Sequence, residues 1–286
     1  MAFKDLLLVL RSYPTPTPDK AILRCVDLAA SWQARLSAIA CGILAKGSRN
    51  PLRHVLIDIA ATVAEQSNTS AADARRLLET FSTAARQRNV LGAAIFEECE
   101  LANIAPVLIE HARLRDLAIL PIPDHDYLAS YDLHLFAEAM IFDSGHPALV
   151  LPQSSIDGEA LAFDTVVVAW DGSRPAARAI ADALPLLAAA KAVRLVTVAN
   201  RKTVAAIQSA PALADHLATH GIKAVVDSVT SAGRRIEAVF ADYVAAHRAD
   251  LIVMGGYGQS RLRQFILGGA TQSLLSAPPT ALFLSH

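Results

Sequence analysis

This sequence of 286 residues has few cysteines, no long apolar run and no excess of basic residues. The three cysteines, Cys25, Cys41 and Cys99, form no Cys-x-x-Cys pair and lie in apolar stretches, so we expect buried thiols and not a disulfide framework. No uninterrupted run of 18 or more apolar residues occurs, and we therefore expect no membrane span. The formal net charge of -1 gives no reason to expect nucleic acid as a partner.

Several enzyme signatures are missing as well. There is no Gly-x-x-x-x-Gly-Lys-Ser/Thr motif, which excludes a Walker-type ATPase, and no Gly-x-Ser-x-Gly nucleophile elbow. No Gly-x-Gly-x-x-Gly motif follows a first strand, which argues against a flavin- or NAD-dependent enzyme. The segment Met1–Asp5 lacks the basic region of a signal peptide, so we expect a cytoplasmic protein.

What the sequence does contain is regular alternation of strand and helix patterns. With 53% hydrophobic and 19% charged residues, the chain can bury a substantial core. In the second half, apolar runs predict strands at 165–170, 193–199, 223–229, 251–254 and 281–284, separated by helices at 176–190, 210–220, 234–247 and 272–277. Ser173 is expected to cap the first of these helices. Such alternation indicates a parallel sheet with helical crossovers.

The first half repeats this plan. Strands are predicted at 5–10, 36–41, 90–97, 117–122 and 148–151, and helices at 21–33, at 104–114 and, as two helices broken near Ser67–Ser70, between 52 and 88. Arg115–Leu120 parallels Ala249–Met254, and Ser144–Leu151 parallels Ser276–Leu284. We therefore predict an α/β fold of two tandem Rossmann-like domains, residues 1–152 and 162–286, each with a five-stranded parallel sheet flanked by helices.

The chemistry is expected in two loops of the second half, because ligands of such sheets bind at the carboxyl ends of the strands. One loop carries Asp171. The other begins with Gly255, Gly256 and Gly258 and, after nine residues, reaches Gly268 and Gly269 ahead of a helix. Glycines allow close approach of the backbone, and a helix start offers unpaired N–H groups, so this pattern indicates a phosphate cradle.

On these residues the chain resembles the universal stress protein family. The strand ending in Met254-Gly255, the Gly255-x-x-Gly258 step, the nine-residue spacing to Gly268, and Val-Val-Ala-Trp-Asp171-Gly-Ser173 match the family pattern over about 162–286. Residues 1–152 match it in plan only, since Pro121–Tyr127 replaces the glycine loop and the counterpart of Asp171 falls near Ser12. The resemblance implies a fold of the adenine-nucleotide alpha hydrolase type, in which the fifth strands of the two halves pair. It also implies a stress-response protein that is regulatory and not catalytic.

The resemblance further implies a site for ATP, ADP or AMP, with Mg²⁺ if a triphosphate is bound. Asp171 would lie near adenine or ribose, Val198 would line the adenine pocket, and Gly255, Gly258, Gly268 and Gly269 would wrap the phosphates. Ala270 and Thr271 would complete the set, with Thr271 in place of the hydroxyl that Gly269 lacks. The first half would be a degenerate copy without this site, standing in for the second subunit of a dimer. The protein partner is unknown, and further homodimerisation is possible.

Other interpretations stay open. The glycines could serve only as a turn and a bare helix start, Asp171 could only cap a helix, and Arg261 and Arg263 could be solvated loop residues and not phosphate ligands. The polar segment with Asp124, His125, Asp126, Asp132 and His134 has no recognised metal-ligand spacing, so a surface loop is preferred. An interaction scaffold without nucleotide, and a slow ATP hydrolase or nucleotide-using enzyme, are the alternatives to a regulatory nucleotide-binding protein.

Overall fold

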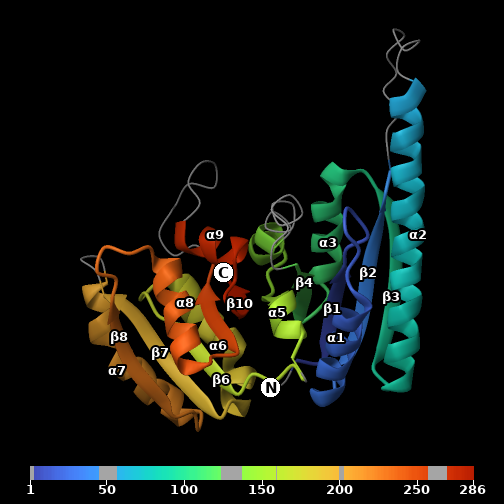
Figure 1. Ribbon diagram of the computed structural model, residues 1–286. Coiled ribbons are helices and arrows are strands. Elements are labelled where there is room, and N and C mark those ends of the chain that lie inside the picture. The colour runs from blue at the N-terminus through green and yellow to red at the C-terminus, as the bar shows by residue number, and fades with distance from the viewer. Residues whose placement is uncertain (1–2, 45–56, 124–136, 159, 200–202, 257–268) are drawn as a thin grey trace.

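The computed structural model describes residues 3–44, 57–123, 137–158, 160–199, 203–256 and 269–286, which form two similar halves side by side (Figure 1). The first half contains β1 (Asp5–Leu10), α1 (Asp19–Ser31), β2 (Arg35–Ile43), α2 (Ile57–Gln87), β3 (Leu91–Cys99), the 3-10 helix η2 (Leu101–Asn103), α3 (Ile104–Ala112), β4 (Leu117–Ile122), helical residues 137–143, β5 (Ala148–Pro152) and α5 (Gln153–Ile156). The second half contains β6 (Thr165–Ala169), α6 (Arg174–Ala189), β7 (Ala192–Ala199), α7 (Val204–Thr219), β8 (Ala224–Thr230), α8 (Ile236–His247), β9 (Leu251–Gly255), α9 (Gly269–Ser276) and β10 (Ala281–Ser285).

All the strands belong to one ten-stranded sheet, in the order β3-β2-β1-β4-β5-β10-β9-β6-β7-β8. Within each half the five strands run parallel, whereas β5 and β10 pair antiparallel, with Leu149 opposite Phe283. The predicted α/β class and the two five-stranded parallel sets are confirmed. The fifth strands also pair as the family resemblance implied, so the two sets form one continuous sheet.

The hydrophobic core is divided by sheet face and not by half. One continuous cluster of buried side chains joins the sheet to α1, α2, α6 and α7, and the other joins it to α3, residues 137–141, α8 and α9. Aromatic side chains cross the junction on the first face, where Phe3 lies 6.1 Å from Phe283 and Trp32 lies 6.4 Å from Phe163, between ring centroids. The central strands bury both faces, which explains their continuous apolar runs.

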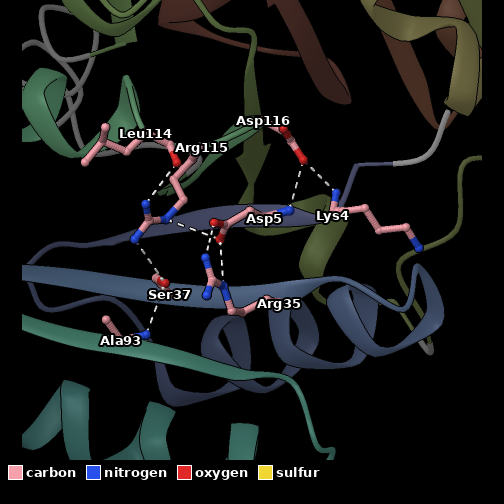
Figure 2. Close-up of polar contacts among 8 residues, drawn as sticks. All are labelled: Lys4, Asp5, Arg35, Ser37, Ala93, Leu114, Arg115 and Asp116. Carbon is pink, nitrogen blue, oxygen red and sulfur yellow. Dashed lines mark hydrogen bonds and ion pairs between the residues drawn. The ribbon is translucent and has the colours of Figure 1, made fainter.

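The repeated Arg/Ala-Asp-Leu segment has a structural cause at the amino ends of the strands (Figure 2). The carboxylate of Asp116 accepts hydrogen bonds from the backbone N–H groups of Lys4 (2.7 Å) and Asp5 (3.0 Å). In the second half, Asp250 accepts from the N–H of Thr165 at 2.8 Å. Each aspartate thus satisfies backbone donors at the start of the neighbouring strand, which accounts for its presence in both halves.

The segment between the halves is fastened to the first half. Ile156 of α5 is buried, the ammonium group of Lys20 donates to the backbone oxygen of Asp157 at 2.9 Å, and the guanidinium of Arg24 donates to that of Gly158 at 2.6 Å. This polar stretch was predicted as the junction between domains. The division at 152 and 162 stays a prediction, because the two cores are continuous across it.

The prediction of two helices broken near Ser67–Ser70 is wrong, since α2 is a single helix from Ile57 to Gln87. Ser70 lies inside it, fully buried, and its hydroxyl accepts a hydrogen bond from the N–H of Ile43 at 3.2 Å. A serine that finds a tertiary partner does not have to end the helix to satisfy its hydroxyl. The helix predicted at 210–220 also begins earlier, at Val204, and contains Pro211.

Candidate functional site

The strand order of the second half places its reversal point at β6, which has β7 on one side and β9 on the other. In open α/β sheets, ligands bind outside the carboxyl ends of the strands at such a point. The loops that leave these ends begin with Asp171 after β6 and with Gly256 after β9, while α9 lies at the same upper side of the second half (Figure 1). Two loops chosen from the sequence therefore leave neighbouring strands at the reversal point.

The loop after β6 is a tight turn that starts α6. The carboxylate of Asp171 accepts a hydrogen bond from the N–H of Ser173 at 2.9 Å, and Gly172 adopts the left-handed conformation with φ of 74°. The hydroxyl of Ser173 accepts from the N–H of Ala176 at 3.2 Å, so the predicted cap is confirmed. Asp171 closes the turn and remains exposed, with one carboxylate oxygen engaged in this bond.

Gly255 is where β9 passes directly against the start of α6. A Cβ atom at this position would lie 2.4 Å from the backbone nitrogen of Ala176, 2.5 Å from the carbonyl carbon of Pro175 and 2.8 Å from its Cβ. No other residue type fits without moving the helix backbone. Close packing therefore requires this glycine whether or not a ligand is bound. The sequence alone could not distinguish a glycine required for packing from a glycine required for ligand binding.

Gly256 contacts the last residues of the chain and one residue of the first half. Its N–H donates to the backbone oxygen of Ser285 at 2.7 Å, and its carbonyl oxygen lies 2.8 Å from Nδ1 of His286. A Cβ atom here would lie 2.9 Å from Cγ2 of Ile141, a residue of the first half. The amide of Gly256 is thus committed within the protein, and a phosphate at this edge would have to use later N–H groups of the loop or those that begin α9.

Val198 lies at the carboxyl end of β7, where its side chain is buried at 6% exposure. Its carbonyl oxygen accepts a hydrogen bond from the hydroxyl of Thr203 at 2.9 Å. A carbonyl oxygen has two lone pairs, and among the residues that the structure describes Thr203 fills one of them. Thr203 was not predicted from the sequence, because no local pattern indicates that its hydroxyl donates to the carbonyl oxygen of Val198 five residues earlier.

The corresponding edge of the first half is filled by α2. The registers of the two halves match, with Asp5 opposite Arg35 as Thr165 is opposite Ala192, so Cys41 is the counterpart of Val198. The carbonyl oxygen of Cys41 accepts from the hydroxyl of Ser12 at 2.6 Å, and that hydroxyl lies 2.9 Å from the hydroxyl of Ser70.

One residue further along β2, a Cβ atom on Gly42 would lie 3.2 Å from Cα and Cβ of Ala71 in α2. The first half therefore packs its own helix over the ends of β1 and β2, where the second half carries the Asp171 turn and Thr203.

The remaining predicted site residues are only partly within the structure. Gly269, Ala270 and Thr271 form the first turn of α9. Gly258, Gly268, Arg261 and Arg263 lie outside the described residues, as do Asp124, His125, Asp126, Asp132 and His134. Within the ranges that the structure describes, no group of three or more His, Cys, Asp or Glu side chains could hold a metal ion.

Two side chains away from this edge, Tyr243 and Cys25, have strongly raised pKa values. The hydroxyl of Tyr243 in α8 donates to the carboxylate of Asp227, which also pairs with Arg194 at 3.1 Å, and burial together with this bond raises the pKa of Tyr243. Burial raises the pKa of the Cys25 thiol to about 12. Cys25, Cys41 and Cys99 are all buried free thiols, as predicted, and Cys25 is unreactive at neutral pH for this reason.

Comparison with known proteins gives a family match for the second half and a shared fold for the whole chain. Residues 162–283 match the profile of the universal stress protein family. A universal stress protein from Archaeoglobus fulgidus DSM 4304 has the same fold, with a TM-score of 0.68 at 15% identity over 98% of this chain and 95% of that chain. A putative universal stress protein from Pseudomonas aeruginosa UCBPP-PA14 gives a TM-score of 0.57 at 14% identity over 99% and 93%. Residues 162–283 are thus similar to the universal stress protein family, and the whole chain shares its fold with both of these structures along nearly their whole length.

The same architecture occurs outside that class. The cytoplasmic domain of a prokaryotic cation chloride cotransporter gives a TM-score of 0.51 at 10% identity over 98% of this chain and 94% of that chain. No curated protein matches the sequence. None of the helices within the described ranges has both the length and the apolarity needed to cross a membrane. The fold alone therefore does not decide the function, which must be argued from the site.

Proposed function

We propose that this chain is a regulatory protein that binds an adenine nucleotide at the carboxyl ends of β6, β7 and β9. The observation that carries the proposal is the meeting of the Asp171 turn and the glycine-rich exit of β9 at the reversal point of a domain with the universal stress protein profile. Asp171 is exposed there, and the carbonyl oxygen of Val198 has one hydrogen-bond donor among the described residues and a second lone pair, so both could contact a nucleoside.

The committed amide of Gly256 refines where the phosphates would bind. Backbone N–H groups at the start of a helix lack partners within the helix and favour anions. The first turn of α9, Gly269–Thr271, and the glycines Gly258 and Gly268 are therefore the proposed phosphate ligands, with Mg²⁺ accompanying a triphosphate. Gly255 contributes by letting β9 approach α6 and not through a bond to phosphate.

A regulatory role is proposed because the sequence has none of the catalytic signatures of a Walker ATPase, a nucleophile-elbow hydrolase or a dinucleotide enzyme. Nucleotide bound between Gly255 and Gly269 would change the surface offered to a protein partner. An interaction scaffold without nucleotide and a slow ATP hydrolase are the alternatives that the test must separate.

Isothermal titration with ATP, ADP and AMP, with and without Mg²⁺, tests the proposal. We expect binding that is lost when Gly258 or Gly268 is replaced by valine, because a β-branched side chain blocks backbone approach to phosphate. Gly158→Val is the matched control, since the nearest atom to its new Cβ lies 4.0 Å away. Absence of binding at millimolar nucleotide would favour the scaffold, and steady release of phosphate from ATP would favour the hydrolase.

A further inference from the structure

Gly255 and Gly256, at the end of β9, contact three other segments of the chain, and one of these segments belongs to the first half. Gly255 packs against the start of α6, and Gly256 bonds to Ser285 and His286 beyond the end of β10. The third contact comes from Ile141, whose Cγ2 occupies the position next to Gly256 where a side chain would otherwise lie. A residue of the first half therefore takes up the space beside the first loop residue of the proposed site.

Phe142 adds a second contact of the same kind. Its ring meets the imidazole of His286 edge-on, with centroids 4.7 Å apart, and the same imidazole lies 2.8 Å from the carbonyl oxygen of Gly256 through Nδ1. Ile141 is buried at 2% exposure and Phe142 is half-buried, in the helical residues 137–143 that precede β5. Two consecutive residues of one half thus touch Gly256 directly and through His286.

We propose that Ile141 and Phe142 are positioning residues that hold the glycine-rich exit of β9, so that the first half sets the affinity of the second half for nucleotide. The inference rests on the proposed nucleotide site for its functional consequence, whereas the restraint on Gly256 exists without any ligand. Coupling of this kind is reciprocal, so nucleotide bound in the second half would in turn stabilise the contact of residues 137–143 with Gly256 and His286. The contacts of Ile141 with Gly256 and of Phe142 with His286 would transmit a conformational change at the site to the first half.

Gly256 offers a direct probe of this contact. Its φ lies outside the left-handed region, so alanine is compatible with its backbone, and the one close neighbour of the added methyl group is Cγ2 of Ile141 at 2.9 Å. Oxygen of Ser285 and Cβ of His286 follow at ordinary distances of 3.6 and 3.7 Å. Among the described residues, the methyl group of Gly256→Ala therefore pushes against the first half, and Ile141→Ala removes the atom that it meets.

The first measurement uses ATP and ADP titrations as a double-mutant cycle. We expect Gly256→Ala to weaken binding about tenfold, within the usual range of coupling between sites, and Gly256→Ala/Ile141→Ala to recover most of that loss. Gly256→Ala/Ile141→Val is the matched control, because valine keeps Cγ2 and should not recover binding. Additive effects of Gly256→Ala and Ile141→Ala would overturn the proposal.

The second measurement needs no nucleotide. Phe142→Ala should raise the amide hydrogen-exchange rate of residues 254–256 about tenfold in the ligand-free protein, while Leu101→Ala, at an exposed site of the same half, leaves it unchanged. Unchanged exchange in Phe142→Ala overturns the proposal, even if nucleotide affinity falls. Failure of the wild-type protein to bind nucleotide refutes the proposed function alone, since the exchange experiment still decides whether the first half restrains this loop.

Discussion

Replacement of Gly255 by alanine should destabilise the protein markedly. The added Cβ would lie 2.4 and 2.5 Å from backbone atoms of Ala176 and Pro175, and backbone atoms in the first turn of a helix cannot rotate away as a flexible side chain can. Overpacked sites cost about 1–3 kcal/mol and occasionally more, and contact with backbone places this one at about 3 kcal/mol. The start of α6 must move away from β9, or β9 must shift within the sheet.

Thermal and urea unfolding measure this cost. For a chain of 286 residues, whose unfolding entropy is about 0.6 kcal/mol/K, a loss of about 3 kcal/mol corresponds to a fall in Tm of roughly 5 °C. Gly158→Ala is the control, because open space surrounds its new Cβ and the lower entropy of the unfolded chain should make it neutral or slightly stabilising. A Tm for Gly255→Ala within about 2 °C of the wild-type value would refute the argument that close packing requires glycine here.

Two further predictions concern polar contacts. Asp116→Ala and Asp250→Ala should each lower the free energy of unfolding by about 1–2 kcal/mol in urea titrations, because each leaves backbone N–H groups at a strand start without their carboxylate, whereas the exposed Asp215→Ala should change it by less than about 0.5 kcal/mol. The raised pKa of Tyr243 means that the folded state keeps its phenol proton where the unfolded state ionises, near pH 10. Stability should therefore be fully present below pH 10 and fall as pH rises beyond it, and Tyr243→Phe should flatten this fall. An equally steep loss above pH 10 in Tyr243→Phe would contradict the assignment.

The strands were predictable because most of them are buried on both faces. Asp5–Leu10 and Leu117–Ile122 were predicted with the boundaries that the structure has, since continuous apolar runs bounded by polar residues leave little choice. Helix α2 was not, because Ser70 looks like a helix breaker until Ser12 and Ile43 supply partners that only the tertiary structure provides. Prediction from local sequence patterns failed at Ser70 because residues distant in the sequence supply its hydrogen-bond partners.

The candidate site stays a prediction from the sequence, and the structure adds contacts around it that the sequence did not indicate. The sequence singled out the glycines at the end of β9, whereas the contact of Gly255 with α6 and the bond of Gly256 to Ser285 depend on how distant segments meet. The hydroxyl of Thr203 at Val198 likewise has no sequence signature. The sequence thus predicted two candidate loops. Which of their backbone N–H groups already bond within the protein depends on tertiary packing and could not be predicted.

The antiparallel pairing of β5 with β10 gives the two halves a freedom that a symmetric dimer lacks. In a dimer of identical subunits, every substitution is imposed on both copies, and a helix that seals one set of strand ends would seal the other. Here the same pairing occurs within one polypeptide, so Ser70 and Ala71 can cover the strand ends of one half while those of the other keep a different loop. Because the two halves are joined in one chain, they can differ in sequence, and a substitution that closes the strand ends of one half leaves those of the other half unchanged.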